Sequence, residues 1–158
     1  MDARSEMQVE RKSDREVVVT RTVNGPARLV FEAWTKPELF RQWWIPKSMG
    51  VSIVSCEMDV RVGGGYRLRL RHGASEPMAF FGKYVEVIPN SRLVWTNEES
   101  EGGAITTVTF EEKAGKTRVV LSELYPSKEA LEAMGGGITA EQFEQLDEVL
   151  ATLETDTP

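Results

Sequence analysis

The stretch YRLRLRH, from Tyr66 to His72, decides which kind of sheet this chain builds. Tyr66, Leu68 and Leu70 alternate with arginines, so that apolar side chains point to one face of the strand and charged ones to the other. This period of two is typical of an antiparallel strand with one buried and one solvated face. The glycine run at 63–65 directly precedes it and indicates a tight hairpin to an earlier strand.

Further strand patterns lie on both sides of this stretch. The first is the β-branched segment Glu16 to Val23. The others are separated by turn residues such as those at 89–91, and they cover residues 51–62, 78–88, 92–97, 104–113 and 117–124. Together with Tyr66 to His72 these segments predict seven strands.

The Asn-Gly-Pro turn at 24–26 ends the first strand, and helical periodicity begins after this turn. A stripe with helical spacing follows, formed by Ala27, Val30, Phe31 and Trp34. Thr35 and Glu38 have capping-box spacing and predict a second short helix, which Pro46 ends.

The chain returns to helical spacing near its end. Ser127 is expected to cap a short helical turn that the glycine run at 135–137 breaks. Thr139 and Gln142 have capping-box spacing, and they precede a stripe that runs from Phe143 to Leu153. We therefore expect an α+β fold in which a curved, seven-stranded antiparallel sheet surrounds a long C-terminal helix. We expect residues 16–154 to form a single domain, between a disordered tail at 1–15 and a C-terminal tail at 155–158.

Composition excludes several classes of function. The chain has 158 residues, a net charge of -6, one cysteine and one histidine. An internal disulfide and a Cys/His zinc site are therefore excluded, and we expect no metal and no cofactor. Net acidity argues against nucleic acid as a partner. No apolar run approaches the roughly 20 residues that cross a bilayer, so we expect no membrane insertion and a cytoplasmic protein.

Three motifs in order resemble a known family. They are WTKPELFRQWWIP (Trp34 to Pro46), DVRVGGGYRLRL (Asp59 to Leu70) and GKYVEVIPNSRLVWT (Gly82 to Thr96). The chain is similar to bacterial proteins that resemble the C-terminal domain of the heat-shock-protein-90 ATPase activator, in the START-related, polyketide-cyclase-like superfamily. The resemblance implies the helix-grip fold. Ile45 stands where that family usually has glycine, and Glu123 where relatives often carry histidine or glutamine.

A cavity lined by aromatic side chains is the main functional hypothesis, because a bent sheet meets its closing helix along only part of their length. The alternative is that the same side chains only fill the core. The candidate ligand-binding residues are Phe40, Trp43, Trp44, Tyr66, Leu68, Trp95, Phe110, Leu121, Glu123, Met134, Phe143 and Leu146.

Four other features have a functional and a plain interpretation. Glu123 is in phase with Leu121, so its carboxylate points inward to a ligand donor or, alternatively, reaches solvent at the strand end. His72 is expected in solvent, and Cys56 as a small buried hydrophobe. The arginines of the strand at 66–72 are a solvated face or, alternatively, a docking stripe for an acidic protein.

Three functions follow, in order of preference. The first is non-catalytic binding of a small hydrophobic or aromatic ligand between the sheet and the C-terminal helix, by a monomer or homodimer. The second, implied by the resemblance, is an interaction module for a heat-shock-protein-90-type chaperone. The third is a cyclase-like or hydrolytic enzyme that uses Glu123 as acid or base.

Overall fold

The computed structural model describes residues 7–74, 76–98, 103–134 and 140–155. These residues form one open antiparallel sheet of eight strands in the order β1-β2-β8-β7-β6-β5-β4-β3. The strands are β1 (Gln8–Arg11), β2 (Glu16–Val23), β3 (Val51–Met58), β4 (Gly65–His72), β5 (Met78–Ile88), β6 (Arg92–Thr96), β7 (Ile105–Lys113) and β8 (Lys116–Leu124).

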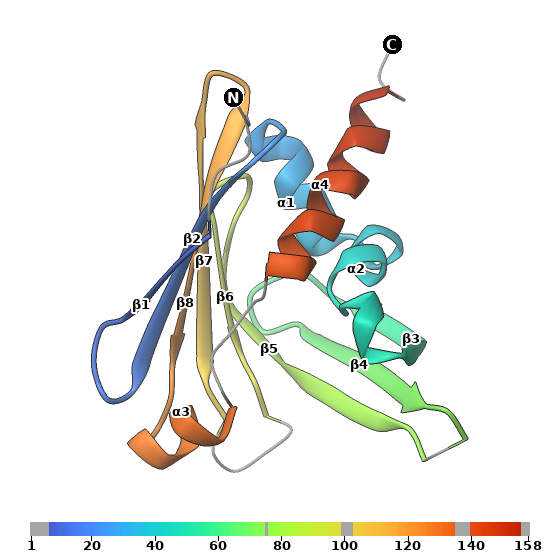
Figure 1. Ribbon diagram of the computed structural model, residues 1–158, viewed down its shortest axis with the longest axis vertical. Coiled ribbons are helices and arrows are strands. Elements are labelled where there is room, and N and C mark those ends of the chain that lie inside the picture. The colour runs from blue at the N-terminus through green and yellow to red at the C-terminus, as the bar shows by residue number, and fades with distance from the viewer. Residues whose placement is uncertain (1–6, 75, 99–102, 135–139, 156–158) are drawn as a thin grey trace.

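The helices segregate from the sheet, as the α+β prediction requires. Three of them, α1 (Ala27–Thr35), α2 (Pro37–Trp43) and α4 (Ala140–Thr155), lie on one side of the sheet, whereas α3 (Lys128–Met134) lies at the end of β8 (Figure 1). A 3-10 turn, η1 (Lys47–Met49), links α2 to β3. The helix-grip architecture is therefore confirmed, with a C-terminal helix held by a curved sheet.

The sheet has one strand more than the sequence predicts. The additional strand is β1, whose residues QVER lie in the segment expected to be a tail. All four side chains are exposed, and β1 pairs with β2 alone, through the antiparallel register from Gln8↔Thr20 to Arg11↔Val17. Backbone hydrogen bonds need no apolar alternation, so hydrophobic periodicity could not indicate this strand.

The sheet curves where pairing is irregular. The register between β5 and β6 shifts at Tyr84 and Glu86, and the β3–β4 register also shifts. Gly82 lies close to this bend, and a Cβ atom there would come within 1.8 Å of the Thr96 carbonyl oxygen. The Tyr66 ring lies against the same glycine, and its hydroxyl donates to the Thr96 oxygen at 2.9 Å. Glycine at position 82 therefore allows β4 and β6 to approach each other across β5.

The start of α1 is held by strands far away in the sequence. Pro26 is its N-cap and supplies no side-chain hydrogen bond. The Ala27 N–H instead donates to Glu112 Oε1 on β7 at 2.9 Å, and the Thr117 hydroxyl on β8 donates to the Gly25 oxygen at 2.8 Å. The first contact satisfies an N–H group that a helix start leaves free, and the second fixes the turn that precedes the helix.

The predicted capping box of α2 is wrong. The N-cap of α2 is Lys36, which makes no side-chain cap, and the Thr35 hydroxyl donates backwards to the Phe31 oxygen at 2.8 Å. Ser127 does cap α3, because its Oγ accepts from the Ala130 N–H at 3.1 Å. Thr139, predicted to cap α4, lies outside the described residues.

Two buried glutamines of α4 bind the backbone at the end of α2 and directly after it, and we call these contacts the glutamine latch. Gln145 Nε2 donates to the oxygens of Trp43 and Ile45 at 3.0 Å each, and its Oε1 accepts from the Lys47 N–H at 2.9 Å. Gln142 Nε2 donates to the Trp44 oxygen. The end of a helix leaves carbonyl groups without partners inside the helix. Because the two glutamines supply those partners, the latch fixes the end of α2 to α4.

An ion pair braces the other face of α4. Arg21 on β2 donates to Asp147 Oδ2 at 3.1 Å, and the Asp147 Oδ1 accepts from the Asn24 N–H at 3.0 Å. The Arg21 guanidinium also lies 5.4 Å from the centre of the Phe143 ring. Because Arg21 is buried, this pair gains from low screening and holds α4 over β2.

We predict that Gln145→Met lowers the free energy of unfolding by about 2–4 kcal/mol, because it keeps the side-chain volume but leaves buried backbone groups unpaired. Urea unfolding followed by circular dichroism measures the change. Glu148→Gln, on the exposed face of the same helix, is the control and should stay within about 0.5 kcal/mol of the parent. Equal stability of Gln145→Met and the parent would contradict a structural role for the latch.

Candidate functional site

Five aromatic rings form a continuous line that leaves the sheet and returns to it, and we call this line the aromatic arch. It begins at Phe110 on β7, whose ring centre lies 5.4 Å from that of Trp34 on α1. Trp34 lies 4.5 Å from Trp43, Trp43 lies 5.4 Å from Trp44, and Trp44 lies 6.4 Å from Trp95 on β6. Since β6 and β7 are neighbours, both ends of the arch rest on adjacent strands.

One ring of the arch is accessible and the other four are closed off from solvent. Trp34, Trp43, Trp95 and Phe110 are buried, whereas Trp44 is half-buried. Phe40 is also half-buried, and its ring stacks on Trp44 at 4.9 Å with an angle of 25° between the planes. Trp44 and Phe40 therefore present ring surface outside while they pack on the core inside.

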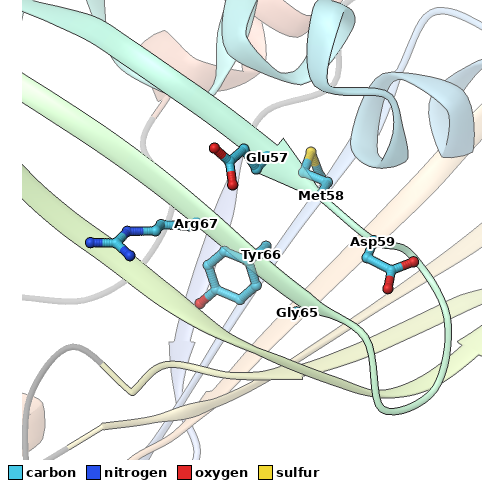
Figure 2. A pocket seen from close by; sticks show the side chains of 6 residues that line it. All are labelled: Glu57, Met58, Asp59, Gly65, Tyr66 and Arg67. Carbon is cyan, nitrogen blue, oxygen red and sulfur yellow. The ribbon is translucent and has the colours of Figure 1, made fainter.

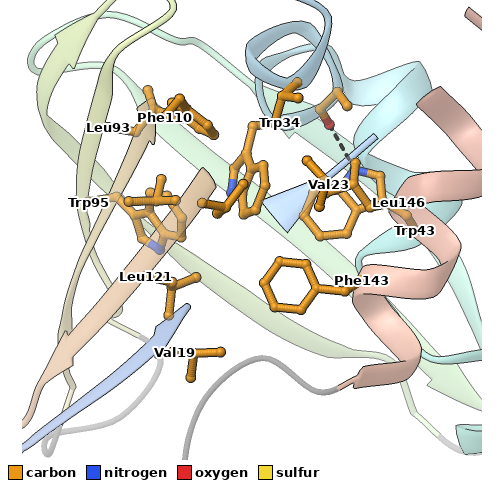
Figure 3. Close-up of a cluster of buried hydrophobic side chains, with 14 of the residues drawn as sticks. Val19, Val23, Trp34, Trp43, Leu93, Trp95, Phe110, Leu121, Phe143 and Leu146 are labelled. Carbon is orange, nitrogen blue, oxygen red and sulfur yellow. Dashed lines mark hydrogen bonds between the residues drawn. The ribbon is translucent and has the colours of Figure 1, made fainter. Parts of the chain in front are cut away.

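Most predicted site residues meet in this region. Leu121, Phe143 and Leu146 are buried in the same cluster as the arch, where Figure 3 shows Phe143 opposite Leu121 across the space between α4 and the sheet. Leu68 is buried on β4 outside that cluster, and Tyr66 is half-buried against it. The Met134 side chain lies outside the described part of the structure. A ligand-binding role for these residues stays a prediction.

A row of polar side chains borders the arch on the same face of the sheet. Tyr66 donates from its hydroxyl to Asn97 Oδ1 at 3.2 Å, and Asn97 Nδ2 donates to Thr106 Oγ1 at 2.9 Å. Thr106 pairs in register with Trp95 on one side and with Glu123 on the other. We call Tyr66, Asn97, Thr106 and Glu123 the polar row.

Glu123 continues this row and is partly buried, with its side chain on the inward face as the sequence predicts. Its Oε2 accepts from the Tyr125 hydroxyl at 2.5 Å. Burial, together with the hydrogen bond and the negative charge of Glu123, raises the pKa of Tyr125 well above its ordinary value. Burial also raises the pKa of Tyr84. Both phenols therefore stay neutral at physiological pH.

An open pocket of about 360 Å³ lies beside Tyr66, at the β3–β4 hairpin (Figure 2). It is lined by Glu57, Met58, Asp59, Gly65, Tyr66 and Arg67. Its lining includes no residue of α4, so it differs in place from the cavity that the sequence predicts between the sheet and the C-terminal helix. Tyr66 belongs both to this pocket and to the polar row.

The remaining candidates lie apart from the arch. His72 is exposed, as expected, and Cys56 is half-buried, where burial raises the pKa of its thiol. The described residues contain no group of three or more acidic, cysteine or histidine side chains placed to hold a metal ion. The described helices all fall short of the length and apolarity that crossing a membrane requires.

Four polar groups near the arch were not identified from the sequence. They are Asn97, Thr106 and Tyr125, together with the indole N–H of Trp34, a residue assigned only to the core. Two of them continue the inward phase of a strand: Asn97 comes two positions after Trp95, directly beyond the end of β6, and Thr106 lies two positions before Val108 on β7. A polar residue at an inward-facing position of a strand pattern was the sequence signal that could have identified Asn97 and Thr106.

We predict that the folded protein resists tyrosine ionisation. Folding raises the pKa values of Tyr84 and Tyr125 above 10.0, the ordinary value, which they have in the unfolded chain. The contribution of the two neutral phenols to the free energy of unfolding is therefore fully present below pH 10.0 and is lost as the pH rises further. An alkaline titration that follows phenolate absorbance and circular dichroism together should show these two phenolates forming only with unfolding. In Tyr125→Phe, the free energy of unfolding should fall less steeply with rising pH than in the parent, by about 1.4 kcal/mol per pH unit. Ionisation of all tyrosines in a still-folded protein would contradict this assignment.

Comparisons with known proteins agree with this architecture. A crystal structure of a Rhodobacter sphaeroides protein superposes with a TM-score of 0.83 at 21% identity, covering 94% of this chain and 99% of that one. A Nitrosomonas europaea protein gives 0.80 at 22% identity, over 91% and 99% of the two chains. A solution structure of a Staphylococcus epidermidis protein gives 0.77 at 24% identity, over 93% and 95%.

These structural likenesses establish the fold. None of the curated proteins compared with the chain matches it. The profile of one family, "Activator of Hsp90 ATPase homolog 1-like protein", matches residues 24–152, which include the aromatic arch and the glutamine latch. The chain therefore belongs to the family of Activator of Hsp90 ATPase homolog 1-like proteins.

Proposed function

We propose that this protein binds a small, mostly apolar molecule, without converting it, between the concave face of the sheet and α4. The observation that carries the proposal is the aromatic arch, which is accessible at Trp44, where the half-buried Phe40 ring stacks on it. Family membership is consistent with a binding module of this general kind.

The accessible rings suit binding because they are already held in place. Trp44 contacts Phe40, Trp43 and Trp95, and its backbone oxygen accepts from Gln142. A ligand that stacks on a ring held in this way loses little further side-chain freedom from the protein. Apolar burial then contributes roughly 25 cal/mol for each Å² removed from water.

The polar row would orient the ligand. It lies on one side of Trp95, while Phe110 and Leu121 supply apolar surface on the same face of the sheet. A carboxylate oxygen, as in Glu123, accepts hydrogen bonds and favours a donor group on the bound molecule. The proposed ligand is therefore an aromatic or polycyclic molecule with a polar group at one end.

We predict that a panel of flavonoids, aromatic polyketides, aromatic acids and lipids contains a class that raises the melting temperature. Trp44→Ala should weaken binding of that class by about tenfold or more, because it removes a stacked ring worth roughly 1.5 kcal/mol or more with its burial. Isothermal titration calorimetry measures the affinity.

Phe81→Ala is the matched control for this loss. Phe81 is 41% exposed, and its side chain lies on the opposite face of the sheet. Its replacement should leave the affinity unchanged. Failure of every class to bind, or an equal loss in both variants, would contradict the proposed site.

A second candidate function, contact with a heat-shock-protein-90-type chaperone, rests on the outer face of β4. Arg67, Arg69 and Arg71 follow one another on this face, and none forms an ion pair with a described residue. The exposed Phe81 lies opposite Arg67 in the register. Three cations beside an exposed ring would suit an acidic protein surface.

We predict that Arg67→Glu together with Arg69→Glu abolishes any stimulation of the chaperone's ATPase turnover, since like charges would then face an acidic partner. Steady-state ATPase measurements with added protein test this. Arg28→Glu with Lys113→Glu makes the same change in net charge on other elements and should keep the stimulation. Unchanged turnover on addition of the parent protein would rule out this second function.

A further inference from the structure

The indole N–H of Trp34 is a buried donor within the aromatic arch, between Phe110 and Trp43. Trp34 is 1% exposed, and its Nε1 has no hydrogen-bond partner in the part of the chain that the structure describes. Its neighbour in the arch differs in this respect, because Trp43 Nε1 donates to the Ala33 oxygen at 2.9 Å. Two indoles in edge contact therefore differ in whether their N–H is satisfied.

A buried donor without an acceptor is unfavourable to folding, by an amount comparable to a lost hydrogen bond. Phenylalanine would fill much of the same space without that cost. The ring neighbours of Trp34 are Trp43 and Phe110, which offer ring faces and no acceptor oxygen in their side chains. The N–H of Trp34 is thus a specific polar group in an otherwise aromatic part of the core.

The direction of this N–H agrees with the proposed site. In Figure 3 the nitrogen of Trp34 lies on the side of the ring toward Trp95 and Leu121, away from Trp43. That side faces the concave surface of the sheet, where Thr106 and Glu123 continue from Trp95 across the strands.

We infer that the N–H of Trp34 donates to a neutral oxygen acceptor of the bound molecule, which is therefore an apolar ring system that carries a carbonyl group. This inference rests on the proposed ligand-binding function. A neutral oxygen fits better than a carboxylate, because a single N–H cannot offset the desolvation of a buried anion. The buried cation beside Phe143, Arg21, already pairs with Asp147, so its charge is balanced within the protein and does not call for an anionic ligand.

The test compares matched pairs of rigid probes that differ only by a carbonyl group: indane with 1-indanone, and fluorene with 9-fluorenone. Calorimetry or fluorescence titration gives the affinity of each probe for the parent, Trp34→Phe and Trp44→Phe. In the parent the ketone should bind about ten times more tightly than its hydrocarbon, the effect of one buried hydrogen bond. Trp34→Phe should remove this preference and keep hydrocarbon binding.

Trp44→Phe is the matched control, since it removes another indole N–H from the same arch. It should weaken both members of a pair and preserve the tenfold preference. Nuclear magnetic resonance adds a readout on the parent protein: the indole N–H signal of Trp34 should move with the ketone and stay with the hydrocarbon. The chain has four tryptophans, so variants of the other three assign this signal even where Trp34→Phe does not fold.

The outcomes separate this inference from the proposed function. If neither member of either pair binds, the proposed function fails and the inference fails with it. If both members of a pair bind equally to the parent, or if the preference survives in Trp34→Phe, the site stands and the role of Trp34 is refuted.

Discussion

The hydrogen bonds from Gln142 and Gln145 to the backbone after α2 support the rest of the candidate site. The helix α2 has seven residues, too few to be stable alone, and Pro46 cannot donate a hydrogen bond after it. Its last carbonyl groups depend on α4 for partners. This dependence sets the position of Trp43 and Trp44, and therefore links the aromatic arch to the docking of the C-terminal helix.

The sheet supplies the other half of the site through its curvature and its side-chain phase. The bend at β5, which Gly82 permits, brings Tyr66 on β4 to the backbone at the end of β6. Neighbouring inward positions then carry different chemistry, with Trp95 beside Thr106 and Thr106 beside Glu123. An apolar region and a polar row thus share one face, which is the arrangement that an amphipathic ligand requires.

Sequence patterns predicted the strands well where one face is buried, because burial imposes the period of two on residues such as Leu68 and Leu70. They missed β1, which is exposed on all its side chains. The capping-box spacing that begins at Thr35 was misleading, since that hydroxyl binds the preceding turn. Spacing names side chains that can reach a group, while competing partners in space decide which group is bound.

The amino-acid sequence by itself determined the fold class, the inward aromatic residues and the inward phase of Glu123, because these depend on local periodicity. Only the tertiary structure decided that Gln145 binds the end of α2, that Tyr125 donates to Glu123, and that the N–H of Trp34 has no partner among the described residues. Hydrogen bonds between segments far apart in the chain depend on distances that no local pattern encodes, and they decide which polar groups remain for a ligand.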